Sequence, residues 1–95
     1  MAIQSFRDER CRAIFNGADP GKRFPSVLMR VVRRKLEMLD AASLLSDLRA
    51  LPNNHLEALS GDRLGQHSIR VNDQFRLCFR WTSAGPFDVE FVDYH

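Results

Sequence analysis

Three arginines, Arg70, Arg76 and Arg80, lie on the polar face of a predicted β-hairpin. Over residues 61–81, apolar side chains alternate with polar ones on both sides of a short Asn-Asp-Gln turn. A period of two on both sides of a turn is typical of an antiparallel hairpin with one buried face. Arginine carries a permanent charge and a fork of donors that suit a phosphate group. An ordinary solvated sheet face has the same pattern, so the hairpin alone leaves both interpretations open.

The last three residues, Asp93, Tyr94 and His95, add groups that can move or orient protons. Cleavage of RNA through its own 2′-hydroxyl needs a group that takes that proton, cations for the charge on the phosphate, and an acid for the leaving oxygen. This route requires no metal, and the histidines of the chain are scattered without ligand spacing. Because terminal residues are usually frayed, a structural or incidental role is the competing interpretation.

The composition predicts one mildly basic domain that spans residues 1–95. Hydrophobic residues make up 44% of the 95 residues, and the formal net charge is +2. The first 40 residues hold nine lysines and arginines against five acidic residues, whereas the remainder holds five against seven. A basic first half suits a polyanion or an acidic partner, and a solvated basic helix face is the alternative.

The sequence indicates neither a membrane anchor nor a disulfide framework. No apolar run reaches the roughly 20 residues of a membrane span, and the N-terminus lacks the apolar stretch of a signal peptide. Cys11 and Cys78 have no metal-ligand spacing, and we expect both to be reduced thiols, with Cys11 buried in a helix. We therefore expect a cytoplasmic protein with no metal and no other cofactor.

The predicted order of elements is β-α-α-β-β-β, an α+β domain with a mostly antiparallel sheet and two N-terminal helices on one of its faces. A short strand is expected at Ala2–Phe6. A first helix, capped by Ser5 or Asp8, should end near Asn16, because Gly17 accepts the left-handed conformation at which helices stop.

The second helix begins near Pro25 and carries an apolar stripe with spacings of three and four. Its inner residues are Leu28, Val31, Val32, Leu36 and Leu39. A short third helix or continuation follows, with Leu44, Leu45 and Leu48. Strands are expected at His55–Leu59, in the hairpin, and at Phe87–Val92, where Phe87, Val89 and Phe91 should share one face.

A longer motif joins these segments. It reads Leu56-x-x-Leu59-x-Gly61-Asp62-Arg63-x-Gly65-Gln66-x-Ser68-Ile69-Arg70-Val71-Asn72, then Phe75-Arg76, and ends in Asp93-Tyr94-His95. Together with the starting Ile3-x-Ser5-Phe6 and the two basic helices, the motif resembles the HigB toxins. These form part of the RelE/ParE superfamily of bacterial toxin–antitoxin systems and are also called plasmid maintenance killer proteins. The resemblance covers essentially the whole chain.

The resemblance implies a RelE-like fold and a ribosome-dependent endoribonuclease. Such a toxin cuts translated mRNA in the decoding site of the small ribosomal subunit by metal-independent attack of the 2′-hydroxyl. The resemblance also implies neutralisation by HigA, a helix-turn-helix antitoxin. The toxin is expected to reach operator DNA only through this antitoxin. Matched residue by residue, Arg76 corresponds to the arginine that contacts the scissile phosphate, and the last three residues to the terminal catalytic residues. Arg63 and Arg70 correspond to basic positions expected to contact RNA.

The sequence departs from the family pattern just before the hairpin. Some characterised members have His-Pro-Leu-Lys before Gly-Asp-Arg, where this chain has Glu57-Ala58-Leu59-Ser60. Glu57 thus replaces a candidate base and Ser60 a cation, and we place Glu57 among the residues that face RNA as a weaker base. In a strand, His55 would share a face with Glu57 and partly replace the missing base. His67 stands where an aromatic residue is frequent, and we expect it to pack rather than to react.

Two alternatives stay open at the level of the sequence. A ParE-like gyrase inhibitor on the same scaffold would poison its target without chemistry of its own. A weakly active module would mainly bind an antitoxin and tune operator occupancy, an option that Glu57 and Ser60 favour. The terminal Asp-Tyr-His favours the nuclease over both.

Overall fold

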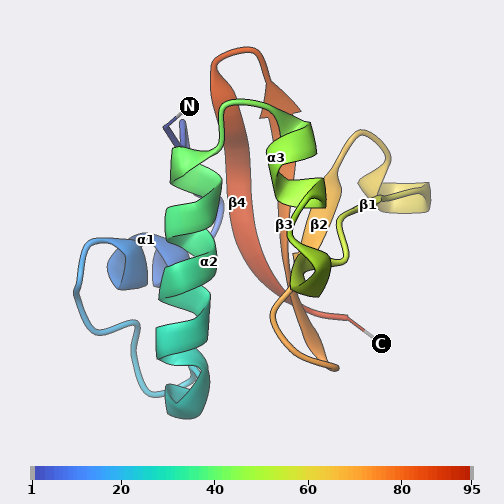
Figure 1. The fold of residues 1–95 in the computed structure, drawn as a ribbon. Helices are drawn as coiled ribbons and strands as arrows, with labels where there is room; N and C mark the ends of the chain where they lie inside the picture. The colour runs from blue at the N-terminus through green and yellow to red at the C-terminus, as the bar shows by residue number, and fades with distance from the viewer. Residues whose placement is uncertain (1, 95) are drawn as a thin grey trace.

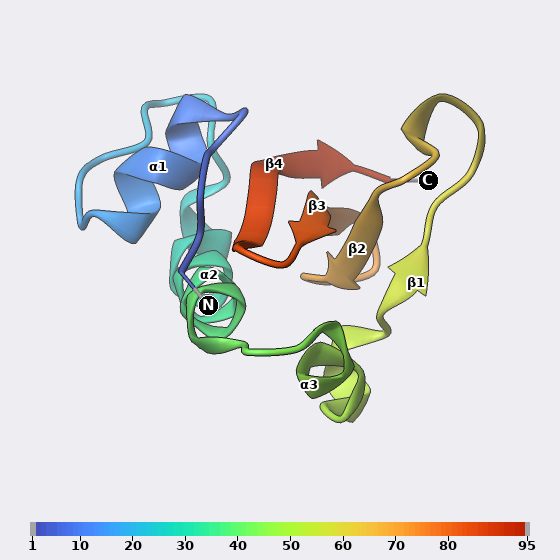
Figure 2. The same ribbon diagram turned by 90° about the horizontal axis from the view of Figure 1, so that it is seen from above.

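A four-stranded antiparallel sheet with the strand order β1-β2-β3-β4 forms one layer of the fold, in a computed structural model that describes residues 2–94. The strands are β1 (Glu57–Ala58), β2 (His67–Arg70), β3 (Phe75–Thr82) and β4 (Gly85–Asp93). The helices α1 (Glu9–Phe15) and α2 (Met29–Ala41) pack against each other beside β4, and α3 (Leu45–Arg49) stands apart from them, next to the segment that leads to β1 (Figures 1 and 2). Short 3₁₀ turns occur at η1 (Ser26–Leu28), η2 (Pro52–Asn54) and η3 (Gly61–Arg63). The arrangement confirms the predicted α+β fold.

Asp8 fixes the start of α1 and ties that helix to the sheet. Its carboxylate accepts a hydrogen bond from the backbone N–H of Arg10 at 3.0 Å, and another from the backbone N–H of Phe91 in β4 at 3.2 Å. Burial by itself would raise the pKa of Asp8, but the hydrogen bonds from Arg10 and Phe91 outweigh it and lower the pKa. The helix ends where expected, since Gly17 has a φ of 80°.

The apolar stripe of α2 faces the core as predicted, and Val32, Leu36 and Leu39 are fully buried. The helix begins at Met29, later than Pro25 suggests, because η1 intervenes. The short third helix is present as α3 with Leu48 buried, but the prediction for Leu44 is wrong. Leu44 precedes the helix in an extended conformation and is 62% exposed.

The core lies between the helices and one face of the sheet. It draws on Cys11 and Ile14 of α1, Phe24, the stripe of α2 and Leu48, and from the sheet on Ile69, Val71, Leu77, Phe79, Val89 and Phe91. Burying aliphatic and aromatic side chains from all three helices against one sheet face stabilises the layered arrangement.

The N-terminal segment does not form the predicted strand. It runs beside β4 and makes a single parallel bridge, Phe6 to Val89, with hydrogen bonds from Gln4 N–H to the Pro86 carbonyl at 2.7 Å and from Arg7 N–H to the Val89 carbonyl at 3.0 Å. Asp8 turns the chain into α1 directly afterwards, so the ladder has no room to extend.

The strand predicted at His55–Leu59 is also shorter, because only Glu57–Ala58 pairs with β2. The turn η2 ends at His55, whose φ of 45° is left-handed. His55 therefore lies outside the strand, and the prediction that it shares a strand face with Glu57 is wrong. Leu59 is buried and Leu56 is half-buried, whereas Ala58 is exposed.

A bulge in β4 overturns the prediction that Phe87 shares a face with Val89 and Phe91. The register between β3 and β4 shifts by one residue after Cys78, and Asp88 takes a left-handed φ of 54°. Phe87 then pairs with Arg80, and directly opposed residues lie on the same sheet face. Phe87 is therefore half-buried on the face away from the helices.

The face of the sheet away from the helices is not an ordinary solvated face, which was one of the two interpretations that the hairpin pattern left open. Ser68 and Cys78 point to it and have no exposed surface. Glu57, Ser68, Cys78 and Glu90 are successive partners across the four strands and form one row. The loop after β1 covers part of this row, because Arg63 reaches across to Glu90. We call this side of the sheet, which carries the row from Glu57 to Glu90, the outer face.

Candidate functional site

Arg76 is the centre of a cluster on the outer face. Its Nε donates to the hydroxyl of Ser68 at 2.7 Å, and its Nη2 donates to the backbone carbonyl of His55. The same Nη2 lies 3.7 Å from the carboxylate of Glu57. The guanidinium also stands over the ring of Tyr94, 5.7 Å from its centre. With its side chain only 13% exposed, Arg76 is held in place by three strands and the chain end.

Strand register explains why these residues meet. Glu57 pairs with Ser68, which in turn pairs with Cys78 on β3, two residues from Arg76. An arginine side chain is long enough to span this diagonal. The left-handed turn at His55 then directs a backbone carbonyl at the guanidinium.

The chain end is tied to the β2–β3 turn. Tyr94 donates its backbone N–H to the Gln74 carbonyl at 2.7 Å, and the Gln74 side chain donates to the carboxylate of Asp93 at 3.2 Å. Asp93 also pairs with Phe75 in the sheet. Asp93 and Tyr94 are thus held at the sheet rather than frayed, whereas His95 lies outside the residues that the structure describes.

Arg63 and Arg70 have other immediate partners. Arg63 forms an ion pair with Glu90 at 2.7 Å and donates to Gln66 at 3.1 Å. The hydrogen bond to Glu90 raises the pKa of Arg63, so its charge is permanent but already compensated. Arg70 pairs with Arg76 across the hairpin, but its guanidinium forms an ion pair with Asp73 in the turn and lines a cavity beside α2.

Sequence reasoning missed two contributors to this cluster, Ser68 and Gln74. Both hold other residues in place, one the guanidinium of Arg76 and the other the chain end. A buried hydroxyl on the face opposite the core is a signal that could have pointed to Ser68, since serine at that position needs a polar partner.

The cysteines and His67 behave as packing residues. Burial raises the pKa of both thiols, that of Cys78 to about 11, so neither is a thiolate at neutral pH. His67 stacks on Phe79 with ring centres 6.4 Å apart, as expected of a packing residue. Within residues 2–94, no group of three histidine, cysteine or acidic side chains has the geometry to hold a metal ion.

The cluster therefore combines a fixed cation, a half-exposed carboxylate and an aromatic ring. Arg76 offers hydrogen-bond donors to an anionic oxygen, and the carboxylate of Glu57, 51% exposed, can accept a proton. Tyr94 is 38% exposed, and a nucleobase can stack on its ring. The cation and the base are two of the three groups that cleavage through the RNA 2′-hydroxyl requires, and an acid for the leaving oxygen is the third.

Comparison with known proteins decides the family. Residues 4–95 match the model of the HigB-like toxins, described as RelE-like toxins of the type II toxin–antitoxin system HigB. The chain belongs to the HigB-like toxin family. This HigB-like toxin is 42% identical to Toxin HigB-1 of Vibrio cholerae serotype O1 over 84 residues, which cover 88% of this chain and 87% of the relative. It is 38% identical to an uncharacterized protein of Haemophilus influenzae over 78 residues, which cover 82% of this chain and 77% of the relative.

Membership of the family has two direct consequences. The HigB-like toxin is the toxin of a type II toxin–antitoxin system, and a type II system implies an antitoxin partner. Separately, no helix within residues 2–94 has the length and hydrophobicity to cross a membrane.

Proposed function

We propose that the HigB-like toxin is a ribosome-dependent endoribonuclease that cleaves translated mRNA, acting as a single domain over residues 1–95 in the cytoplasm. The cluster of Arg76, Glu57 and Tyr94 on the outer face is the observation that carries this proposal. Family membership supports it, because the family is one of RelE-like toxins. We further propose a HigA-like helix-turn-helix antitoxin as the partner through which the toxin is held at operator DNA.

In the proposed reaction the RNA 2′-hydroxyl attacks the adjacent phosphorus, and the bond from phosphorus to the 5′-oxygen breaks. The products are a 2′,3′-cyclic phosphate and a 5′-hydroxyl, and no metal takes part. Arg76 stabilises the extra negative charge on the phosphate oxygens, since its Nε is held by Ser68 and its Nη groups face the site.

Proton transfer is assigned to Glu57 and to the chain end. Glu57 takes the proton of the 2′-hydroxyl, and His95 gives one to the leaving 5′-oxygen. Asp93, which pairs with the core-side residue Phe75 and accepts from Gln74, orients the chain end. Tyr94 stacks on a nucleotide beside the scissile phosphate. Arg63 and Arg70 add positive potential on the path of the RNA, although each has an acidic partner of its own in the protein.

Induced expression of the wild type and of Arg76→Ala tests the proposal. Arg80 is the matched control, because it lies on the same strand and outer face, pairs at 3.9 Å with Asp88, and is 46% exposed. Mapping of mRNA 5′ ends should reveal cuts within translated reading frames for the wild type and Arg80→Ala. For Arg76→Ala we expect cleavage to fall by about 10²-fold or more, as for other lost stabilisers of a developing oxyanion.

A reporter mRNA without a start codon serves as the second control and should stay intact. Growth arrest with intact mRNA would contradict the nuclease. Stalled gyrase complexes and DNA damage signalling would then favour a ParE-like inhibitor, and toxicity that survives every site substitution would favour an antitoxin-binding module.

A further inference from the structure

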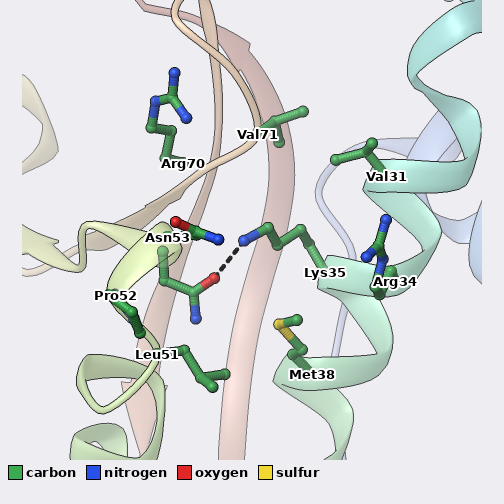
Figure 3. A pocket seen from close by; sticks show the side chains of 10 residues that line it. Val31, Arg34, Lys35, Met38, Leu51, Pro52, Asn53, Arg70 and Val71 are labelled. Carbon is green, nitrogen blue, oxygen red and sulfur yellow. Dashed lines mark hydrogen bonds between the residues drawn. The ribbon is translucent and has the colours of Figure 1, made fainter.

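A cationic cavity of about 460 Å³ lies between α2 and the segment that joins α3 to β1 (Figure 3). Three cations line it, Arg34 and Lys35 from α2 and Arg70 from β2. Its ten lining residues, all within the described part of the chain, include no acidic side chain. The cavity is therefore a site of concentrated positive charge.

Lys35 is an unusual lining residue, because a lysine is rarely buried and this one is only 9% exposed. Its amine donates to the side-chain oxygen of Asn54 at 2.5 Å, as the dashed line in Figure 3 shows, and this partner is neutral. Burial lowers the pKa of Lys35, and repulsion from Arg34 and Arg70 lowers it further. Among these cations only Arg70 has an acidic partner within residues 2–94, namely Asp73 in the hairpin turn. A carboxylate entering the cavity would supply the missing counter-charge.

The remaining lining favours a protein segment over a nucleic acid. Val31, Met38 and Leu51 give the cavity aliphatic walls, and Leu51 is 42% exposed at its rim. Sites for single-stranded RNA stack bases on aromatic side chains, and none of the ten lining residues is aromatic. A buried lysine and two more accessible arginines next to aliphatic and methionine side chains fit an acidic peptide with aliphatic neighbours.

We propose that this cavity is a docking site for an acidic segment of the antitoxin. One carboxylate of that segment reaches Lys35 and Arg34, and an aliphatic neighbour packs on Leu51 and Met38. The proposal rests on the antitoxin partnership that family membership implies, and it is independent of whether the toxin cleaves RNA. None of the residues of the Arg76 cluster lines the cavity, although Arg70, the strand partner of Arg76, does.

Affinity measurements with a matched pair of variants test this site. Arg34→Glu reverses a lining charge, whereas Arg33→Glu reverses the exposed neighbouring charge of the same helix, which does not line the cavity. Refolded full-length toxin and its purified cognate antitoxin are titrated by calorimetry at low and physiological salt. We expect Arg34→Glu to weaken binding at least tenfold and Arg33→Glu to change it less than twofold. Equal losses for both variants, or no loss for Arg34→Glu, would overturn the proposal.

A photo-crosslinking residue at Leu51 identifies the occupant directly. Mass spectrometry of the irradiated complex should place the crosslink on an antitoxin segment with an Asp or Glu beside aliphatic residues. A crosslink to a segment without an acidic residue, or no crosslink to the antitoxin, contradicts the proposal. Loss of binding to mRNA or ribosomes with unchanged antitoxin affinity in Arg34→Glu would instead assign the cavity to RNA. Circular dichroism and thermal unfolding of each variant exclude misfolding as the cause.

Discussion

The hydroxyl of Ser68 accepts a hydrogen bond from Nε of Arg76 at 2.7 Å, across the two central strands of the sheet. Ser68 is fully buried, so no solvent competes for this bond. With Nε occupied, the guanidinium cannot rotate freely. Its Nη2 stays directed at Glu57 and the His55 carbonyl, and its plane stays over the Tyr94 ring. Ser68 is thus a positioning residue that acts through Arg76.

Replacing Ser68 by Ala should lower the cleavage rate about tenfold, the equivalent of about 1.4 kcal/mol of lost transition-state stabilisation. We expect the loss in kcat rather than in KM, because Arg76 keeps its charge but loses its fixed orientation. Cleavage kinetics on ribosome-bound mRNA measure this, and Ser68→Thr, which retains a hydroxyl, should recover most of the rate. Full activity of the Ala variant would show that the bond does not matter for catalysis.

The Glu57 carboxylate, 3.7 Å from Arg76, stands where other family members have a candidate base. If it takes the proton of the 2′-hydroxyl, Glu57→Gln should reduce cleavage by about 10²-fold, a typical contribution of a general base. Single-turnover cleavage of ribosome-bound mRNA measures this effect.

Glu9→Gln is the matched control for this charge change. Glu9 is 80% exposed and pairs with Arg12 at 3.2 Å on α1, so its loss should leave the rate within about twofold, since exposed ion pairs contribute little. An unchanged rate in Glu57→Gln would assign the role of base to the chain end instead.

Asn54 connects two buried polar groups, and its removal should be costly. Its side chain accepts from Lys35 and donates to the Leu48 carbonyl at 3.1 Å, and it has no exposed surface. Asn54→Leu should destabilise the fold by about 3 kcal/mol, because the amine and the carbonyl each lose their partner. Urea unfolding should reveal a partial recovery of stability in the double variant Asn54→Leu, Lys35→Met, which removes the buried ammonium group that has lost its partner. Additive losses in the double variant would contradict this coupling.

The sequence was sufficient to predict the α+β class, the hairpin and the position of α2. Each follows from a regular spacing of apolar residues and from turn or capping residues at the ends of the element. The apolar stripe that contains Val32, Leu36 and Leu39 is such a period. The prediction that Phe87 shares a face with Val89 and Phe91 failed for a physical reason. A single left-handed residue, Asp88, reverses the alternation, and a period of two gives no sign of a bulge.

The candidate site was predicted in part. Arg76 and Tyr94 were named from the resemblance, and Glu57 from a departure from the family pattern. The three lie close together on the outer face, and their catalytic roles stay predictions. The partners that hold them in place were not foreseen. The Ser68 hydroxyl and the His55 carbonyl depend on strand register and on one left-handed turn. Side-chain type alone does not encode either feature, which explains why contacts between distant segments escaped sequence reasoning.

His67 makes stability depend on pH. Its Nδ1 is buried without a hydrogen-bond partner among the described residues, and burial, followed by repulsion from Arg49, lowers its pKa. The unfolded chain, with a histidine pKa of about 6.5, therefore binds a proton that the folded protein rejects. The contribution of His67 to stability is constant above that pH and falls as the pH drops from about 6.5 to the folded pKa.

His67→Phe should remove this dependence while keeping the stacking on Phe79. The variant should match or exceed the wild type at pH 7.5, by up to about 1 kcal/mol, since an unpaired buried nitrogen is lost. Its advantage should grow at pH 5.5, where only the wild type loses stability through protonation of this ring. Urea midpoints of both proteins at pH 7.5, 6.5 and 5.5 measure the difference. A difference that stays constant across the three pH values would show that His67 does not couple folding to protons, because carboxylate titration is common to both proteins and cancels.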